Sequence, residues 1–397
     1  MCARRKSRVL LCVQNDSGRL YYGGTTSILK QVYYHNGCAM ADTVSGSFKP
    51  NYPLLPYRVN FVCEHPERWP ELLSGAPTPL LNPDDIPERI VSSSDSWIVC
   101  TYLRLSAVSG NVRVVDRAIP GEICVVDGRD IAIRNWSYGS FVICCRGDCP
   151  DPTIADWVVA QNSLQKCARK SICIPLWPQP GLISRDITRG AILTNLAYKG
   201  HIRNLDDSFK TAAFRSALVD LGVSFQLDVC DDQFFRTTGW NDFRNTDALL
   251  AARNLTLEDA LIKPPSKLVN AWGAGVPALL GPEPAFRELR KSDLDYIEIR
   301  SPDDVIKALR RLKDQPALYA AMIANGLTRY TEFTTAKIVE RWLAMLAGPV
   351  ATEYRTWCAA SASTRLFRYA RRSLQFKSAM RAYMRNINHG PRIFDED

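Results

Sequence analysis

The chain has 397 residues, of which 46% are hydrophobic and 23% are charged, a composition typical of folded globular proteins and not of disordered ones. The longest apolar runs have about 8 residues, well short of the roughly 20 that a membrane-spanning helix needs. The net charge of +9 allows a nucleic acid or an anionic membrane as a partner but requires neither. The length predicts two or three domains. The basic first ten residues lead into the strand-like run RVLLCV, so we expect no signal peptide.

The cysteines indicate a reduced, cytosolic protein. Their number, 13, is odd and no spacing repeats, which argues against a disulfide framework. Cys144, Cys145 and Cys149 form the one cluster that resembles a metal site, but the chain has no CxxC pair and four histidines, so we expect no metal. Six cysteines lie inside apolar runs, where a thiol acts as a small hydrophobic side chain: Cys12, Cys63, Cys100, Cys124, Cys144 and Cys145.

The N-terminal half predicts short strands separated by loops. A helix is predicted over residues 25–34, after Gly23 and Gly24, and the Pro-rich residues 50–56 and 77–87 are predicted to be loops. Short β-branched runs bounded by turn residues predict strands at residues 8–13, 58–63, 97–103, 111–115, 122–126 and 141–145.

The C-terminal half follows a break in composition at residues 174–186. Pro175, Pro178 and Pro180 exclude a helix or a central strand there and predict a stiff crossover between two domains. Beyond it, strands alternate with helices, which predicts a parallel, doubly wound sheet. The predicted strands are residues 191–198, 223–229, 246–252, 276–280 and 295–299, and the predicted helices are residues 207–221, ended by Gly222, and two segments that begin at Ser266 and Pro302.

The helix after Ser301 has the clearest start signal. Ser301 is a good capping residue, Pro302 suits the first helical position, and the two aspartates that follow suit the positive end of the helix dipole. Apolar residues then recur at helical spacing, which marks the buried face.

The candidate ligand-binding residues are concentrated in residues 263–288, KPPSKLVNAWGAGVPALLGPEPAFRE. Pro264 and Pro265 prevent a helix before Ser266, so Lys263 precedes a helix N-terminus and Lys267 lies in its first turn. The unpaired N–H groups of a helix N-terminus favour a phosphate. Cations in the first turn oppose the helix dipole, and a bound anion would relieve that cost. The alternative is a solvated basic loop.

This stretch resembles a known enzyme family. A helix, AGVPALLG, an acidic residue, the run SPDDVIKALRRLKDQPALYAAMIANGLTRYTEFT and a Trp-bearing helix follow one another as in the second domain of GT-B glycosyltransferases, a resemblance over residues 191–345. It implies an α/β fold of two Rossmann-like domains that face a cleft. Residues 1–175 would form the acceptor-side domain, residues 176–348 the nucleotide-sugar domain, and residues 349–397 a basic helical tail that returns to the first domain or stays separate.

The resemblance also implies a donor site. Lys263 and Lys267 would hold the diphosphate. Asn270 stands where many retaining members have a glutamate that binds the ribose, and an amide can bind only through weaker, neutral hydrogen bonds. The family's earlier glutamate is also absent, since Ile262 and Lys263 occupy that region. The stereochemical outcome is therefore left open.

Other candidates lie on loops around this site. Glu283 and Glu288 are candidates for sugar or ribose binding and Arg287 for phosphate binding, against the alternative of helix capping and weak surface ion pairs. Loops at the carboxyl ends of strands are the ligand side of α/β sheets, although ordinary connections there are as common. The nucleotide-binding candidates on such loops are Lys199, Gly200, His201, Arg203, Arg253 and Asn254.

The catalytic candidates come from the first domain. An inverting enzyme needs a carboxylate or histidine to deprotonate the acceptor hydroxyl. Asp16 follows the first predicted strand and His65 follows the second, FVC. For both residues the alternative is a role in a turn.

The tail, residues 363–385, has seven Lys or Arg residues, no acidic residue and a broad, imperfect apolar stripe. Three interpretations stay open. The tail is a helix that returns to the first domain, an amphipathic helix on an anionic membrane, or a nucleic-acid-binding segment.

Together these features predict a glycosyltransferase that moves a hexose-type sugar from a nucleotide-diphosphate donor to a hydroxyl of a glycan or glycolipid. We expect no cofactor besides the donor and no metal, because lysines and a helix dipole can neutralise the leaving diphosphate. The predicted location is the cytoplasm, either free or peripheral at the inner face of a membrane, with nucleic acid as the less favoured partner. The alternatives are a sugar-nucleotide epimerase of the same architecture and a nucleic-acid-binding protein that acts through the tail.

Overall fold

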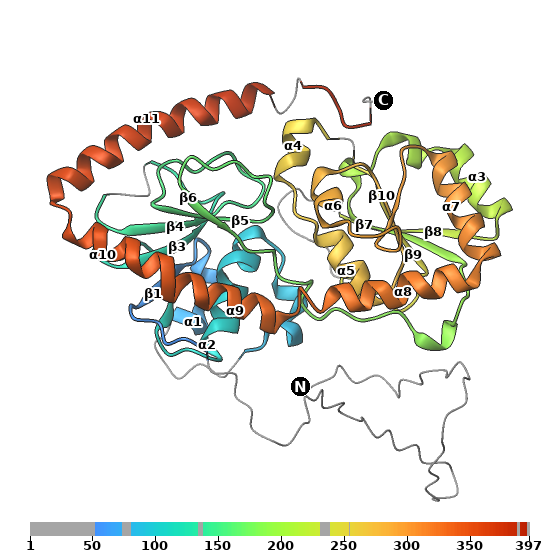
Figure 1. Cartoon of the computed structure of the whole chain (residues 1–397), viewed down its shortest axis with the longest axis horizontal. Coiled ribbons are helices and arrows are strands. Elements are labelled where there is room, and N and C mark those ends of the chain that lie inside the picture. The colour runs from blue at the N-terminus through green and yellow to red at the C-terminus, as the bar shows by residue number, and fades with distance from the viewer. Residues whose placement is uncertain are drawn as a thin grey trace, which may run out of the picture. The chain divides into compact units, whose positions relative to one another are not determined.

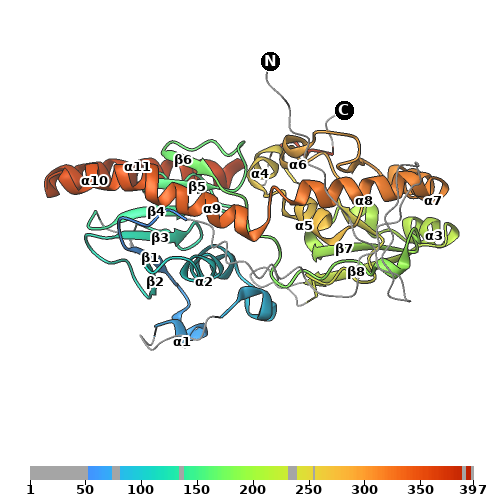
Figure 2. The same ribbon diagram turned by 60° about the horizontal axis from the view of Figure 1, so that its bottom comes forward.

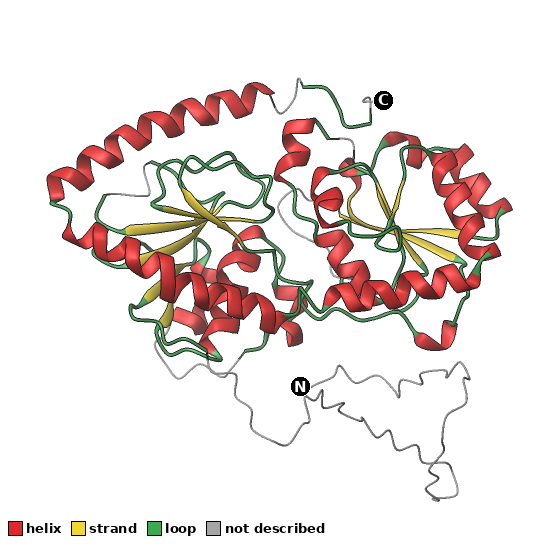
Figure 3. Ribbon diagram, in the orientation of Figure 1, coloured by secondary structure: helices red, strands yellow, loops and turns green. Residues whose placement is uncertain are grey.

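A computed structural model describes residues 52–73, 81–133, 138–230, 239–253, 255–386 and 390–394. The predicted strand at residues 8–13, the predicted helix at residues 25–34 and the candidate Asp16 lie outside these ranges. Two parallel sheets with helices on their faces make up the described part of the chain (Figures 1 and 3). The predicted fold class, α/β with two Rossmann-like units, is confirmed.

The first sheet has six parallel strands in the order β2-β1-β3-β4-β5-β6. Four predicted strands, at residues 58–63, 111–115, 122–126 and 141–145, are confirmed as β1 to β4. The last two strands were not predicted. The strands are β1 (Val59–Val62), β2 (Val112–Val115), β3 (Ile123–Asp127), β4 (Phe141–Cys145), β5 (Trp157–Ala160) and β6 (Lys170–Cys173).

The predicted strand at residues 97–103 is wrong, because this segment is helical. A π-helical turn (Asp95–Val99) leads into α2 (Cys100–Ser106). Nearly every side chain of the segment is buried, so the run lacks the polar face of a surface helix and cannot be told from a buried strand by its periodicity. The carboxylate of Asp95 supports the turn by accepting the backbone N–H of Ser92 at 2.9 Å.

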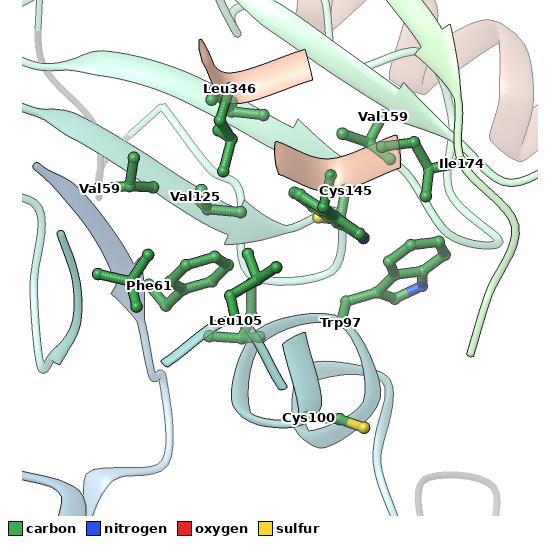
Figure 4. Close-up of a cluster of buried hydrophobic side chains, with 14 of the residues drawn as sticks. Val59, Phe61, Trp97, Cys100, Leu105, Val125, Cys145, Val159, Ile174 and Leu346 are labelled. Carbon is green, nitrogen blue, oxygen red and sulfur yellow. The ribbon is translucent and has the colours of Figure 1, made fainter. Parts of the chain in front are cut away.

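Alternate residues of the first sheet build a core on each of its faces. One core joins strand residues to α2 and to residues far later in the chain, such as Leu346 (Figure 4). Burying these side chains supplies the main driving force for folding. The labelled members in Figure 4 are Val59, Phe61, Trp97, Cys100, Leu105, Val125, Cys145, Val159, Ile174 and Leu346.

The second sheet has five parallel strands in the order β11-β10-β9-β7-β8. The predicted parallel sheet of the C-terminal half is therefore confirmed, with shifted strand ends. β7 continues to His201, beyond the predicted end at residue 198, so Lys199 and Gly200 lie within the strand and not in a loop after it. The strands are β7 (Asn195–His201), β8 (Ser224–Cys230), β9 (Ala248–Ala251), β10 (Ala278–Leu280) and β11 (Ile297–Glu298).

Local capping explains where several helices begin. Ser301 caps the helix that follows it, as predicted, since its hydroxyl accepts the backbone N–H of Asp304 at 3.2 Å. The structure adds the reciprocal bond, in which the Asp304 carboxylate accepts the backbone N–H of Ser301 at 3.0 Å. The helix predicted over residues 207–221 is interrupted, because Thr211 caps a new helix by accepting the N–H of Phe214. Ser266 is not a cap as predicted, because it is already the first helical residue.

The helices up to residue 330 lie along the two sheets. α4 was not predicted, because its six residues give too little periodicity to recognise. The helices are α1 (Pro70–Leu73), α2, α3 (Ala212–Asp220), α4 (Leu257–Ile262), α5 (Ser266–Ala274), α6 (Pro284–Leu289), α7 (Pro302–Asp314) and α8 (Pro316–Tyr330).

The last helices are α9 (Thr335–Met345), α10 (Ala351–Ala359) and α11 (Ala362–Asn386). Trp342 of α9 is fully buried in the core of the first sheet. The chain therefore returns to the first sheet before residue 348, the predicted end of the second domain. α11 packs on the other face of that sheet, where Phe376 is buried. Figure 2 gives a second view of these three helices.

Three further features concern the described residues alone. None of the helices in the described ranges could span a bilayer. Within the same residues, no group of three or more His, Cys, Asp or Glu side chains is placed to hold a metal ion. The ten cysteines in the described ranges are free thiols, and burial raises the pKa of Cys63 and of Cys124 to about 11.

Candidate functional site

A cavity of about 750 Å³ lies at the carboxyl ends of strands from both sheets. The loops after β3, β4 and β5 line it from the first sheet. The end of β7, the loop after β9 and the turn between α4 and α5 line it from the second sheet. This volume is typical of a site for a small molecule, and the carboxyl ends of parallel strands are where α/β sheets bind ligands.

The walls of the cavity are strongly cationic. Seven Lys or Arg residues line it against two aspartates, among the residues that the structure describes. A concave surface of one sign concentrates ligands of the opposite sign, so an anionic ligand is favoured. The cations are Arg129, Lys199, Arg203, Arg253, Lys263, Lys267 and Arg392, and the aspartates are Asp148 and Asp259.

The turn between α4 and α5 brings Lys263 to the cavity. Lys263 ends α4, Pro264 and Pro265 follow, and α5 begins at Ser266. The amide group of Asn162, in the loop after β5, donates to the carbonyl oxygen of Lys263 at 2.7 Å. The first N–H groups of a helix have no acceptor within the helix. The turn therefore presents the positive end of α5 to the cavity from a fixed position.

The side chain of Lys263 is held in its protonated, positively charged form. Its ammonium group lies 2.9 Å from a carboxylate oxygen of Asp259 and 3.3 Å from one of Asp148. Burial by itself would lower the pKa of Lys263, but the two carboxylates more than offset this, so the pKa lies above its ordinary value. For Asp148 burial acts to raise the pKa, but Lys263 and a hydrogen bond from Gln161 outweigh it, so the pKa lies below its ordinary value. Both aspartates are thus ion-paired with one lysine.

Lys267 approaches the cavity from the first turn of α5. Its ammonium group donates to the backbone carbonyl of Lys199 and lies 5.0 Å from the centre of the Tyr198 ring. Gly200 makes room for it, because a Cβ atom there would lie 2.9 Å from the Lys267 nitrogen. The carbonyl of Lys199, the ring of Tyr198 and the space at Gly200 therefore determine the position of the Lys267 ammonium group.

Lys199 and Arg253 line the cavity but are already paired. The Lys199 ammonium binds the carboxylate of Asp228 and donates to the carbonyl of Asp242 at 2.7 Å. Arg253 forms a two-pronged ion pair with the fully buried Glu283, with one nitrogen–oxygen distance of 2.7 Å. Both cations contribute positive charge to the cavity wall, but partners within the second domain already bind their side chains.

Asn270 lines the cavity one turn after Lys267. Its side-chain oxygen accepts the backbone N–H of Gln179 at 3.0 Å, in the Pro-rich crossover between the two sheets. The residue thus fixes the crossover against α5, and its amide also borders the cavity.

Aromatic residues complete the walls, and no sequence pattern predicted their position. Trp97, in the helical turn before α2, and Trp177, in the crossover, line the cavity. Trp240 and Phe243, which precede β9, also line it, and the rings of Trp240 and His201 meet edge to face at 5.3 Å. Flat apolar rings beside cations suit a ligand with both a planar or sugar ring and a charged group.

Residues near the end of the described chain also reach the cavity. Tyr383 of α11 and Arg392 both line it. The backbone around Arg392 is fixed on the second domain, because the N–H of Ile393 donates to the carbonyl of Leu255 at 3.0 Å. Neither residue was a candidate from sequence, since only the return of the chain places them here.

The structure leaves four sequence candidates away from the cavity. The described residues that line it do not include His65, Glu283, Arg287 or Glu288. Arg287 pairs with Glu298 at 2.9 Å, and the Glu288 carboxylate accepts the N–H of Ser163 at 3.2 Å. The imidazole of His65 is half exposed and lies 3.4 Å from a carboxylate oxygen of Glu67. Asp16 is outside the described residues.

Comparison with known proteins finds similar solved structures at low sequence identity. No family model matches the sequence, and no curated protein matches it. The chain is similar to the solved structure of TarM, with 9% identity over 62% of this chain and 58% of TarM and a TM-score of 0.44. It is also similar to a sucrose-phosphate synthase from Thermosynechococcus elongatus, with 11% identity over 73% of this chain and 83% of that chain and a TM-score of 0.41.

A third similar structure is AviGT4, a glycosyltransferase involved in avilamycin A biosynthesis. Its identity is 12%, over 77% of this chain and 99% of AviGT4, with a TM-score of 0.43. The chain thus spans 58% of the length of TarM and nearly all of AviGT4. Glycosyltransferases are among the solved structures that resemble it.

Proposed function

We propose that the protein is a glycosyltransferase that moves a sugar from a nucleoside-diphosphate donor to a hydroxyl of a glycan or glycolipid. The observation that carries this proposal is the cationic cavity into which the N-terminal turn of α5 projects with Lys263 and Lys267. A diphosphate needs several cations and N–H donors in one place, and this turn supplies both.

The donor would lie on the second sheet. Its diphosphate would bind at the start of α5, between the ammonium groups of Lys263 and Lys267. Because the leaving group of the transfer is the nucleoside diphosphate, these charges would stabilise the negative charge that develops as the sugar departs. Asn270, one turn further along α5, would meet a ribose hydroxyl with its amide.

The acceptor would enter from the first sheet. Trp97 and Trp177 border that side of the cavity, and aromatic rings offer apolar surface for the faces of sugar rings. Arg129, which follows β3, adds a cation on the same side. Of the two sequence candidates for the base that deprotonates the acceptor hydroxyl, His65 does not line the cavity and Asp16 lies outside the described residues.

The first experiment measures nucleotide binding to the full chain. A calorimetric screen with nucleoside diphosphates should find one that binds, and Lys267→Ala should weaken its affinity by about 1.5–3 kcal/mol, the value of a hydrogen bond to a charged group. Lys307→Ala is the matched control, because it removes one exposed positive charge from α7. Equal affinity of the wild type and Lys267→Ala would refute the diphosphate site.

The second measurement separates transfer from the alternative epimerase. A transferase releases nucleoside diphosphate only as sugar joins an acceptor, whereas an epimerase converts the sugar nucleotide without any acceptor. Both aspartates that line the cavity are ion-paired with Lys263, which favours transfer, because epimerisation with hydrolysis needs further acidic groups there. Conversion of a sugar nucleotide in the absence of an acceptor would favour the epimerase.

A further inference from the structure

Helix α11 is unusual in its charge. Its 25 residues include seven Lys or Arg residues and no acidic residue. Five of these cations are exposed, whereas Arg372 is ion-paired with Asp156 and Arg365 stacks on the ring of Trp357 at 4.4 Å. The helix therefore carries an uncompensated positive surface on the side that faces away from the protein.

The inner face of α11 is fixed to the first sheet. Phe376 is 7% exposed and packs into the core on that face of the sheet. The hydroxyl of Tyr369 donates to the carbonyl of Ile133 at 2.8 Å. These contacts hold the helix in one rotation about its axis, so the same residues always point outward.

The outer face combines the cations with large apolar side chains. Phe367 is 71% exposed and Leu374 is 70% exposed. They are seven residues apart, which places them on the same side of the helix two turns from each other. The exposed Arg371 lies between them, and the exposed Lys377 and Arg381 follow at helical spacing. Apolar and cationic side chains thus alternate along one outward face.

We propose that this outer face binds an anionic membrane surface, with Phe367 and Leu374 inserted at the boundary between headgroups and acyl chains. A helix with apolar and cationic residues on one exposed face is the pattern of helices that lie in the membrane interface. A second copy of the chain does not suit this face, because two cationic surfaces repel each other. Nucleic acid would satisfy the charges but would leave the two apolar side chains without a role.

The test uses flotation of the full chain with vesicles at low salt. Vesicles of equal parts phosphatidylcholine and phosphatidylglycerol should carry the wild type, and vesicles of phosphatidylcholine alone should not. The double variant Phe367→Ser, Leu374→Ser should bind roughly tenfold or more weakly. Because both side chains are exposed, its melting temperature should not change. The matched control is Val219→Ser, which removes a 71% exposed apolar side chain from α3.

The charges are tested separately. Arg371→Glu with Lys377→Glu should abolish vesicle binding, and 1 M salt should do the same to the wild type, because the Debye length falls to about 3 Å. A wild type that stays unbound at low salt would overturn the proposal. So would a double apolar variant that binds vesicles as tightly as the wild type. Binding of a DNA or RNA duplex in place of vesicles, unaffected by the apolar variant, would assign the face to nucleic acid instead.

Discussion

The substitution Gly200→Ala tests how the cavity holds its key lysine. Gly200 lies in β7, and its backbone is outside the left-handed region, so alanine fits the strand conformation. The added Cβ, however, would lie 2.9 Å from the ammonium nitrogen of Lys267 and 3.0 Å from the hydroxyl oxygen of Tyr198. At least one of these two groups must move.

Lys267 should move, because Tyr198 is the more rigid of the two. Tyr198 is fully buried and its hydroxyl donates to the carbonyl of His201 at 2.8 Å. The ammonium group of a lysine lies at the end of a flexible four-carbon chain and shifts at little cost. Gly200→Ala should therefore leave stability nearly unchanged while displacing the charge that binds the diphosphate. Losing a hydrogen bond to a charged group costs about 1.5–3 kcal/mol, which is a roughly 10- to 150-fold weaker affinity.

The assay is calorimetric titration of the nucleoside diphosphate into four proteins: wild type, Gly200→Ala, Lys267→Ala and the double variant. If the alanine acts through Lys267, the double variant should bind no more weakly than Lys267→Ala alone, because the interaction is already lost. Gly110→Ala is the control, since nothing lies within 4 Å of the Cβ that it would add. Wild-type affinity for Gly200→Ala, or full additivity in the double variant, would refute the reasoning.

Two further predictions concern Asn270 and Asp130. Asn270→Ala should lower the free energy of unfolding by about 1 kcal/mol, because the N–H of Gln179 loses its acceptor. Urea denaturation measures this, and unchanged nucleotide affinity in the same variant would exclude a ribose contact. Burial and neighbouring carboxylates raise the pKa of Asp130 to about 7, so the folded protein holds a proton that the unfolded chain releases near pH 4. The stability of the wild type should fall as pH rises from about 4 to 7, and Asp130→Asn should flatten this slope; identical slopes would contradict it.

Local signals in the sequence predicted the fold well where a single residue decides the backbone. The helix cap at Ser301 and the helix stop at Gly222 depend on neighbours within a few residues, and both are found. The same holds for Pro264 and Pro265, which separate α4 from α5. The prediction of the turn that places Lys263 and Lys267 at the cavity depended on these features.

The sequence failed where partners far apart in the chain decide the outcome. Glu283 was predicted to bind sugar or ribose, but it is buried against Arg253, thirty residues earlier. Arg287 was predicted to bind phosphate, but its side chain pairs with Glu298. No local sequence pattern distinguishes a charged residue that is available to bind a ligand from one that is already ion-paired within the protein. Arg392 is the opposite case. It was not a candidate from the sequence, and only the return of the chain to the second domain brings it to the cavity.

Helix α11 links membrane binding to the kind of acceptor that the cavity receives. Its outer face carries Phe367 and Leu374, and near its end Tyr383 lines the cavity. If that outer face lies on a membrane, one rigid helix contacts both the lipid and the site. A lipid-linked acceptor could then reach the cavity while its lipid stays in the bilayer, whereas a free glycan would gain nothing from the contact. Vesicle binding by α11 would therefore favour a glycolipid acceptor, and its absence would favour a free glycan, independently of whether the donor site binds a nucleoside diphosphate.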